Sequence, residues 1–349
     1  MKPAPYFLAI LGLATAAACG TDDDLPPLSD AKVLQCPAPG ALPFRTESHT
    51  FARDQSATLA ENNPRNKDEG GDVLGNPGGA TANIYLADDA EPASGAFAYL
   101  GVKARTTPTK GLFSNPIAGE PVSLWHYDDA SGTWEARGRA TTDDNGQYSI
   151  DSAGFIAPNG EPIYSILEGD LSCADQYNFL LPPGTKVVVS DIDGTLTTDD
   201  AELIMQVADE SYVPKMMTGG DAMLQAWDAK GYPIIYLTAR SHQFRSESRV
   251  WLRDFDFPAG PMITSNMTNE ADVYKTAWLK RMFGAFGWVP VAAYGNADTD
   301  IIAYENAGIP KDKTFIVGPL AGNSGTVAIP NMDYTQHTAS FVAAQPNNQ

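Results

Sequence analysis

From residue 186 to residue 317, short apolar runs alternate with longer amphipathic stretches, and this alternation constrains the fold more than any other feature of the sequence. The runs 187–190 and 234–237 have the length of buried strands, and the stretch 219–230 between them has the spacing of a helix with one apolar face. Strands that alternate with helices form a parallel sheet covered by helices, so the sequence predicts an α/β domain here. The further runs are 291–294 and 314–317, and the further amphipathic stretches are 241–255, 270–286 and 298–307.

A chain of 349 residues exceeds one ordinary domain of about 100 to 200 residues, so we expect a second domain. Between residues 83 and 181, short β-type runs separated by turn clusters predict a small β-sandwich. Residues 21–82 are rich in Asp, Pro, Gly and Asn and lack hydrophobic periodicity, which is typical of a flexible tether. The predicted boundaries are 1–18 for a signal peptide, 19–82 for the tether, 83–181 for the β-sandwich domain, 182–335 for the α/β domain and 336–349 for a tail.

The N-terminus has the layout of a secretory signal, with one lysine, an apolar run over 6–18 and then small residues. This run is too short to span a bilayer, which takes about 20 residues. Residues 16–20 are similar to the cleavage box of bacterial lipoproteins, which predicts an exported, membrane-anchored protein that faces the periplasm or the cell surface and carries its lipid on Cys19. Ordinary secretion is the alternative. Export permits disulfides, so Cys36 and Cys173 form either one disulfide or two separate thiols.

The net charge excludes one class of partner. The chain has 23 Lys and Arg against 43 Asp and Glu, a formal net charge of -20. General affinity for nucleic acid depends on basic side chains that neutralise phosphates, so we expect no nucleic-acid partner.

Polar residues follow the predicted strands directly. Asp191 and Asp193 come after the first strand and are followed by Gly194, which allows a ligand to approach the backbone closely. Residues 238–240 (Thr-Ala-Arg) follow the next strand of the series, and the acidic segment 295–300 follows a later one. In a parallel sheet, ligands bind at the carboxyl ends of the strands. Phosphoryl transfer requires a nucleophile, a proton donor and cations, and these residue types supply all three.

Together with Lys275, these segments resemble the four motifs of the haloacid dehalogenase (HAD) superfamily, most of whose members are Mg²⁺-dependent phosphatases with an aspartate nucleophile. The resemblance covers about 186–319 and implies an α/β fold with a Rossmann-like, HAD-like parallel sheet, preceded here by the small β-sandwich domain. More closely, the chain is similar to the catalytic domain of lipin-type phosphatidate phosphatases and to the related domain of phosphatidylinositol-transfer proteins. The segments that carry this closer similarity are 190–195, 231–240, 294–304 and 307–310.

The resemblance implies a role for each matching residue. Asp191 attacks phosphorus to form an aspartyl-phosphate, and Asp193 protonates the leaving alcohol and then activates water. Mg²⁺ relieves the repulsion between these carboxylates and a phosphate dianion. The implied catalytic residues are Asp191, Asp193, Thr238 and Lys275, the phosphate-binding residues are Thr195, Thr238, Ala239, Arg240 and Lys275, and the metal ligands are Asp191, Asp193 through its main-chain carbonyl, Asn296 and Asp300.

Several of these roles have alternatives. Arg240 contacts the phosphate or holds the loop, and the same two roles apply to Thr195. Asp300 is either a direct metal ligand or a residue that orients the ligands, and Asp298 is an extra carboxylate that competes with it and with Asn296.

The gaps between the motifs are too short for a large lid, and an open site admits bulky substrates, including headgroups at a membrane surface. Arg245, Arg249 and Arg253 form a basic stripe on 241–255 that contacts either anionic headgroups or solvent. The predicted function is Mg²⁺-dependent hydrolysis of phosphatidate to diacylglycerol, with a phospholipid as the partner. The alternatives are a HAD phosphatase that acts on a soluble phosphomonoester and a non-catalytic phosphatidate-binding module.

Overall fold

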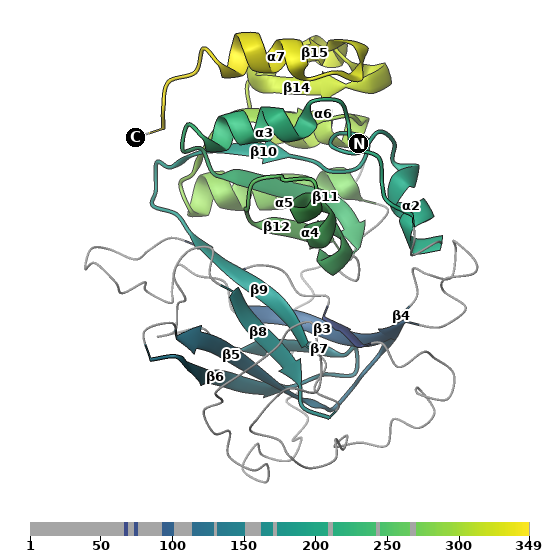
Figure 1. The fold of residues 1–349 in the computed structure, drawn as a ribbon, viewed down its shortest axis with the longest axis vertical. Coiled ribbons are helices and arrows are strands. Elements are labelled where there is room, and N and C mark those ends of the chain that lie inside the picture. Colours follow the sequence, from purple (N-terminus) through teal and green to yellow (C-terminus); the bar gives the residue numbers. More distant parts are fainter. Residues whose placement is uncertain are drawn as a thin grey trace, which may run out of the picture.

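The computed structural model describes residues 66–68, 73–75, 93–100, 114–128, 131–150, 162–169, 173–208, 212–241, 245–265 and 270–348. The predicted signal peptide, Cys19 and Cys36 lie outside these residues, and with them the predicted lipid anchor and the disulfide to Cys173. The described residues form a six-stranded parallel sheet with helices and, below it in Figure 1, two smaller sheets that are mainly antiparallel. The predicted α/β class is confirmed at this level.

Every strand pair of the six-stranded sheet is parallel. The strand that precedes the paired aspartates, β10, lies inside the sheet, with β11 on one side and β13 on the other. In sheet order the strands are β12 (Met262–Ser265), β11 (Ile234–Ser241), β10 (Lys186–Ser190), β13 (Val289–Gly295), β14 (Thr314–Val317) and β15 (Val327–Ile329).

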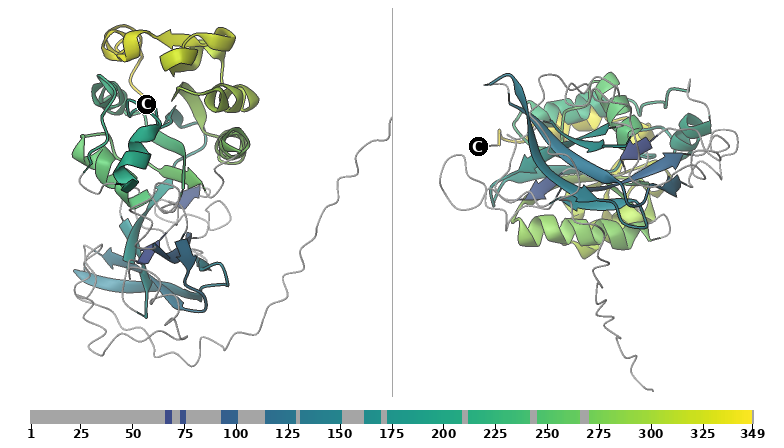
Figure 2. Two further views of the ribbon diagram at one scale, coloured as in Figure 1. Left: turned by 90° about the vertical axis from the view of Figure 1, so that its right-hand side faces the viewer. Right: turned by 90° about the horizontal axis from the view of Figure 1, so that it is seen from below.

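Both faces of this sheet are buried. Val188 of β10 belongs to one hydrophobic core, whereas Val187 and Val189 belong to the core on the opposite face. A strand that is covered on both sides reads as a continuous apolar run, which is why the alternation along the sequence marks it. Figure 2 shows helices on both sides of the sheet. The α-helices described in this region are α2 (Ala201–Ala208), α3 (Gly220–Asp228), α4 (Arg245–Asp254), α5 (Ala271–Lys280) with a π-helical turn at Arg281–Ala285, α6 (Asp298–Asn306), and α7 (Thr335–His337) with a π-helical turn at Thr338–Val342.

The region before the parallel sheet contains the predicted β-strands and some that the sequence did not indicate. β3 to β9 fall inside the range 83–181 predicted for the β-sandwich domain, whereas β1 and β2 fall inside the range assigned to the tether. One sheet contains β2 (Val73–Gly75), β9 (Cys173–Leu180), β8 (Pro162–Leu167), β5 (Pro121–Asp128) and β6 (Thr133–Thr141), and the other contains β1 (Asn66–Asp68), β3 (Ala93–Leu100), β4 (Ser114–Pro116) and β7 (Gln147–Ile150).

Strand β9 joins the two regions, and Figure 1 shows it running from the lower sheets toward the parallel sheet. Its Phe179 packs in the same core cluster as Leu279 and Trp288 of the α/β region. The indole Nε1 of Trp288 donates a 2.9 Å hydrogen bond to the main-chain oxygen of Leu181, just after β9. The two regions therefore share buried apolar surface and are not linked by a connecting peptide alone.

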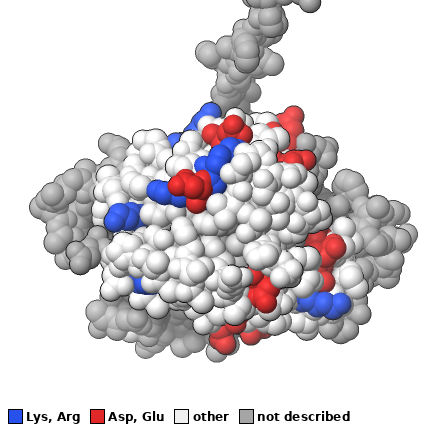
Figure 3. Space-filling view, turned by 90° about the horizontal axis from the view of Figure 1, so that it is seen from above, with Lys and Arg blue, Asp and Glu red and all other residues white. Residues whose placement is uncertain are grey.

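The C-terminal segment packs on the α/β core. Val342, within the predicted tail, is fully buried, and the hydroxyl of Tyr232 donates to the main-chain oxygen of Pro346. Between residues 314 and 348 the only Asp, Glu, Lys or Arg is Asp333. The face seen from above carries few charged side chains (Figure 3). None of the helices in the described part of the chain has the length and apolar character needed to cross a membrane.

Candidate active site at the carboxyl ends of the strands

Three neighbouring strands and two helices supply the predicted site residues, with Asp300 on α6. Asp191 and Asp193 follow β10, residues 238–240 lie at the end of β11, Asn296 follows β13, and Lys275 projects from α5. Because β11, β10 and β13 are adjacent and parallel, their carboxyl ends lie along one edge of the sheet. Residues that are up to about a hundred positions apart in the sequence therefore meet in one place.

The centre of the site is a buried group of three charged side chains. Lys275 Nζ lies 2.9 Å from Asp191 Oδ1 and 2.7 Å from Asp300 Oδ1. The exposed fractions of these residues are 2% for Lys275, 5% for Asp191 and 0% for Asp300, so water screens their charges little. A buried charge is costly unless it is paired, and here one ammonium group is shared by two carboxylates, which leaves an excess of negative charge.

The pKa values in this group follow from that imbalance. Burial raises the pKa of Asp191 from an ordinary value of 3.8 to about 7; Lys275 opposes the rise, and the nearby Asp300 and Asp193 add to it. Burial by itself lowers the pKa of Lys275, but Asp191 and Asp300 together hold it above its usual range. Lys275 therefore stays positively charged at physiological pH. Additional positive charge beside Asp191 would lower the pKa of Asp191 and favour its ionised form.

Asp300 has both carboxylate oxygens engaged. Oδ1 binds Lys275, and Oδ2 accepts hydrogen bonds from the main-chain N–H groups of Asn296, at 3.0 Å, and Ala297, at 3.1 Å. Gly295 permits this approach, because a Cβ there would lie 2.5 Å from the Cβ of Asp300. Of the two roles predicted for Asp300, this geometry favours orienting the loop after β13. Asp298 is exposed at the start of α6.

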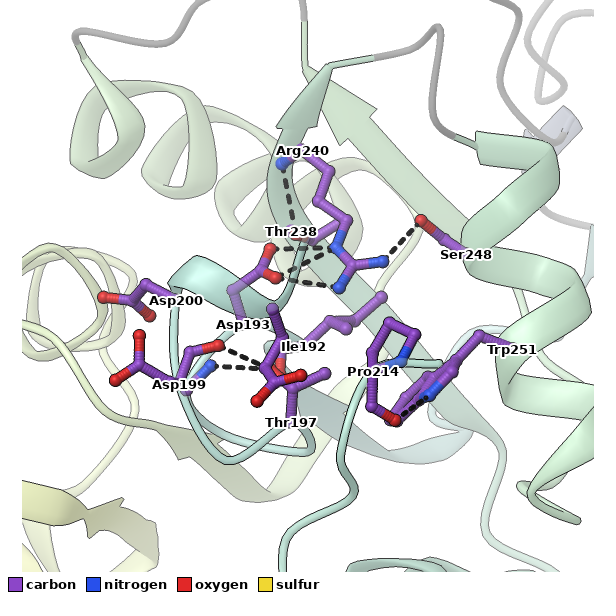
Figure 4. Close-up of polar contacts among 12 residues, drawn as sticks. Ile192, Asp193, Thr197, Asp199, Asp200, Pro214, Thr238, Arg240, Ser248 and Trp251 are labelled. Carbon is purple, nitrogen blue, oxygen red and sulfur yellow. Dashed lines mark hydrogen bonds and ion pairs between the residues drawn. The ribbon is translucent and has the colours of Figure 1, made fainter. Parts of the chain in front are cut away.

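Arg240 holds Asp193 (Figure 4). Its Nε donates to both carboxylate oxygens of Asp193, at 3.1 and 2.9 Å, and its Nη2 donates to Oδ1 at 2.8 Å. Its Nη1 donates to Ser248 Oγ of α4 at 2.8 Å. Arg240 is 2% exposed, so it forms a buried, two-pronged ion pair of the kind that fixes a carboxylate in place. The structure therefore favours the loop-holding role of Arg240 over a direct phosphate contact.

The loop glycine lies where the two motifs touch. Gly194 has φ +63°, and a Cβ there would lie 2.0 Å from Asn296 Nδ2 and 2.6 Å from Asp200 Oδ1. Above it, Asn296 Nδ2 donates a 3.0 Å hydrogen bond to Asp200 Oδ1. Glycine is required at this position both for its backbone conformation and for the space above it.

The remaining predicted phosphate-binding residues lie at the same edge. Thr195 is fully buried; its hydroxyl donates to Asn296 Oδ1 at 3.4 Å, and its carbonyl accepts from the hydroxyl of Tyr334 at 3.2 Å. Thr238 is also buried, and its Oγ1 accepts from the main-chain N–H of Arg240 at 3.1 Å. Ala239, between Thr238 and Arg240 in the sequence, is partly exposed. Thr195 thus stabilises the loop after β10.

The segment between Thr197 and Met216 forms a small structure beside the site that the sequence analysis did not identify. It contains α2 and closes with an isolated antiparallel bridge between Thr197 and Met216. Its buried Glu202 accepts hydrogen bonds from the Thr198 hydroxyl, the Tyr212 hydroxyl and the main-chain N–H of Lys215. The segment is fixed by these bonds and is much smaller than a domain-sized lid.

The basic stripe predicted on 241–255 does not form one exposed surface. Arg245 is fully buried, the guanidinium of Arg249 lies 4.4 Å from the ring centroid of Tyr177 on β9, and Arg253 is exposed beside Asp254. Helical spacing placed the three arginines on one face, but Arg245 and Arg249 pack against other parts of the protein and only Arg253 is exposed. Arg249 stacks on Tyr177 of the antiparallel region. The stripe as a whole is therefore neither a surface for anionic headgroups nor a face in contact with solvent.

Three residues of the site were missed in the sequence. Asp200 lies in the same acidic run as Asp191 and Asp193, so its position was a usable signal. Ser248 and Tyr334 gave none, because a serine on a helix and a tyrosine near the C-terminus have no distinguishing pattern.

Residues 188–318, which contain most of this site, match the family described as PITM 1-3, LNS2 domain. This part of the chain resembles an LNS2 domain. The name stands for Lipin/Ned1/Smp2, a HAD-like, phosphatase-related fold, so the expected similarity to lipin-type and phosphatidylinositol-transfer proteins is confirmed at the level of the domain.

Curated relatives agree with the family match. The protein retinal degeneration B of Drosophila melanogaster is 30% identical over 232 residues, which are 65% of this chain and 18% of that protein. The membrane-associated phosphatidylinositol transfer protein 3 of Mus musculus is 28% identical over 206 residues, 58% of this chain and 20% of that protein. The chain thus spans about a fifth of the length of the relatives it matches. Among solved structures, a chain of the Pnkp1/Rnl/Hen1 RNA repair complex is 18% identical, with a TM-score of 0.29 over 40% of this chain and 48% of that chain, a similarity too weak to indicate function.

These relatives overturn the predicted localisation. A bacterial, exported lipoprotein anchored through Cys19 was expected, with secretion as the alternative, whereas the relatives are proteins of fly, mouse and human, several of them named as membrane-associated. The prediction rested on the lysine, the apolar run and the small residues before Cys19, all of which lie outside the described residues.

Proposed function

We propose that the α/β region is a Mg²⁺-dependent phosphatase that removes the phosphate of phosphatidate, leaving diacylglycerol, through an aspartyl-phosphate on Asp191. The observation that carries the proposal is the buried group of Asp191, Lys275 and Asp300 at the carboxyl ends of adjacent parallel strands. Similarity to a phosphatase-related domain, in relatives named for a phospholipid, supports the lipid substrate.

The nucleophile and its cation form the first part of the mechanism. Asp191 attacks phosphorus with one carboxylate oxygen, which requires the ionised form. Lys275 Nζ, 2.9 Å from Asp191 Oδ1, lies where it neutralises charge on the attacked phosphoryl group. Thr238, at the end of β11, supplies a hydroxyl to a phosphoryl oxygen. Asp300 keeps Lys275 in place and is not consumed in the reaction.

Asp193 is the proposed general acid and base. It protonates the departing alcohol and then removes a proton from the water that attacks the aspartyl-phosphate. Its carboxylate is held from one side by Arg240, whose third donor binds Ser248. Arg240 is thus a positioning residue that fixes the distance between Asp193 and the nucleophile, two positions before it in the loop.

The residues of the site fit a divalent metal ion. Asp191, Asp193 and Asp300 are three carboxylates that share two cations, Lys275 and Arg240, and a phosphate dianion adds further negative charge. No three His, Cys, Asp or Glu side chains converge as a ready-made metal site among the residues that the structure describes, so main-chain and amide oxygens must contribute. Asp191, the main-chain carbonyl of Asp193 and Asn296 would hold Mg²⁺, with Asp300 orienting them. When bound, the ion supplies positive charge at the phosphoryl oxygens.

A second candidate function is phosphatidate binding without hydrolysis. Several of the relatives are named as phosphatidylinositol transfer proteins, which favours it. A binding module has no need of a nucleophile, whereas this chain has Asp191, buried and paired with a lysine. We therefore rank hydrolysis first.

The test is phosphate release from phosphatidate in mixed micelles, with and without Mg²⁺, beside a panel of soluble phosphomonoesters. We expect metal-dependent release from phosphatidate that disappears in Asp191→Asn. Release from soluble esters alone would keep the aspartate chemistry and reject the lipid substrate. Vesicle binding that depends on phosphatidate, with no hydrolysis of any ester, would support the binding module instead.

A further inference from the structure

Asn296 can meet a metal ion in two ways, and only one is productive. Its side-chain amide has an oxygen that accepts and a nitrogen that donates, and the two are nearly the same size and shape. A cation is bound by the oxygen and repelled by the N–H₂ group. If the amide were free to turn over, part of the protein would present the wrong atom to the site.

Two contacts fix the amide in one orientation. Asn296 Nδ2 donates to Asp200 Oδ1 at 3.0 Å, and Asn296 Oδ1 accepts from the Thr195 hydroxyl at 3.4 Å. A carboxylate cannot donate a hydrogen bond, so Asp200 selects the nitrogen and directs the oxygen the other way. The two contacts therefore agree.

The position of Asp200 is itself fixed. It directly precedes α2, whose first N–H groups are capped by the neighbouring Asp199, with Ala201 N donating to Asp199 Oδ1 at 2.7 Å. The contact passes over Gly194, where a Cβ would overlap both partners. Figure 4 shows Asp199 and Asp200 beside the loop that carries Asp193.

We propose that Asp200 is a positioning residue of the site, which holds the Asn296 amide with its oxygen available to the metal ion. The inference rests on the proposed Mg²⁺ site and adds a residue to it. Residues that orient a metal ligand typically change metal affinity about 10- to 100-fold when they are removed. Asp200 acts through Asn296 and does not touch the reacting atoms.

The variants separate orientation from charge. Asp200→Ala removes the acceptor and the charge, and Asp200→Asn removes the charge and keeps an acceptor oxygen. Asp199→Asn removes an equal charge one residue away and keeps the oxygen that caps α2. If Asp200 orients the amide, Asp200→Ala should weaken Mg²⁺ binding about 10- to 100-fold, whereas the other two variants should stay within a few-fold of wild type. Asp200 is exposed, so the variants should fold, which a thermal melt checks.

Two readouts are needed. Calorimetry measures Mg²⁺ affinity of the full chain, and NMR with selectively labelled asparagine measures the side-chain N–H₂ signal of Asn296, assigned with Asn296→Ala. Supporting results are an Asn296 signal that moves in Asp200→Ala but not in Asp199→Asn, together with the affinity pattern given above. In Asn296→Ala, a further Asp200→Ala change should then have little effect on Mg²⁺ affinity.

The proposal would be overturned by an Asn296 signal that Asp200→Ala leaves unchanged. Equal losses of affinity in Asp200→Ala and Asp200→Asn would also overturn it, because charge and not orientation would then be the cause. A wild-type chain that binds no Mg²⁺ would refute the metal in the proposed function, and it is distinguished from these outcomes because the NMR readout needs no metal.

Discussion

Replacing Asp191 by asparagine is expected to stabilise the metal-free protein at neutral and alkaline pH while it abolishes hydrolysis. The reason is the burial of this carboxyl group, which shares a single lysine with Asp300 and has Asp193 nearby, so that its pKa rises to about 7. The ionised Asp191 carboxylate that the reaction requires therefore destabilises the folded protein. Asparagine has nearly the same shape and no charge, so it removes the cost and keeps the packing.

The magnitude follows from the difference between the ordinary value of 3.8 and the value of about 7 in the folded state. One pH unit corresponds to about 1.4 kcal/mol, so ionised Asp191 costs the folded state roughly 4 kcal/mol above pH 7. Below pH 3.8 the group is protonated in both states and costs nothing. Between the two values the unfolded chain gives up the proton first, so stability is lost as the pH rises toward 7 and the loss is then constant.

The assay is urea unfolding followed by tryptophan fluorescence, in buffer with a chelator, at about pH 5 and about pH 8. We expect the difference in free energy of unfolding, variant minus wild type, to be about 3 kcal/mol larger at the higher pH. Asp298→Asn makes the same chemical change at an exposed carboxylate and should show no such dependence. An Asp191→Asn difference that is independent of pH, or smaller at the higher pH, would refute the electrostatic reasoning.

Three further substitutions test separate contacts of the site. Lys275→Met leaves Asp191 without its cation and should destabilise the protein by about 3 to 5 kcal/mol at neutral pH in urea unfolding, whereas a change below about 1 kcal/mol would mean that the ion pairs are solvated. Arg240→Lys replaces a two-pronged contact to Asp193 with a single point charge and should lower kcat with little change in KM, as steady-state kinetics would reveal; an effect on KM alone would indicate phosphate contact instead. Gly194→Ala introduces a Cβ against Asn296 at positive φ and should lower stability by about 1 to 3 kcal/mol and weaken Mg²⁺ binding; wild-type behaviour in both melts and calorimetry would show that the loop adapts freely.

Much of the α/β region was predictable because its strands are covered on both faces. The runs that became β10, β11, β13 and β14 are continuous apolar segments, and the polar residues after them mark the edge of the sheet where they meet. The resemblance to the four HAD motifs also placed Asp191, Lys275 and Asn296 in one site. None of these inferences needed a long-range contact other than the parallel pairing itself.

The rest depended on contacts that the sequence does not display. The spacing of Arg245, Arg249 and Arg253 predicts a shared helix face but not what covers it, and here Tyr177 from the antiparallel region covers part of it. In the same way, Arg240 lies at the end of a strand, as a phosphate-binding residue would. Its guanidinium instead binds Asp193 and is held by Ser248 of helix α4.

The C-terminal segment gives the clearest example of a missed contact. Residues 336–349 were predicted to be a tail, but Val342 is buried. Just before this range, the hydroxyl of Tyr334 donates to the carbonyl of Thr195 at 3.2 Å. The role of Tyr334 can be recognised only when the position of the loop that it contacts is known.

Trapping the covalent intermediate tests the central claim most directly. Phosphatidate and Mg²⁺ are mixed with the full chain, the reaction is quenched with borohydride, which reduces an aspartyl-phosphate to homoserine, and the peptides are analysed by mass spectrometry. We predict homoserine at position 191 that depends on substrate and on metal, with Asp193 unmodified. Phosphate release from phosphatidate without modification at position 191, or with modification at position 193 instead, would contradict the assignment of Asp191 as the nucleophile.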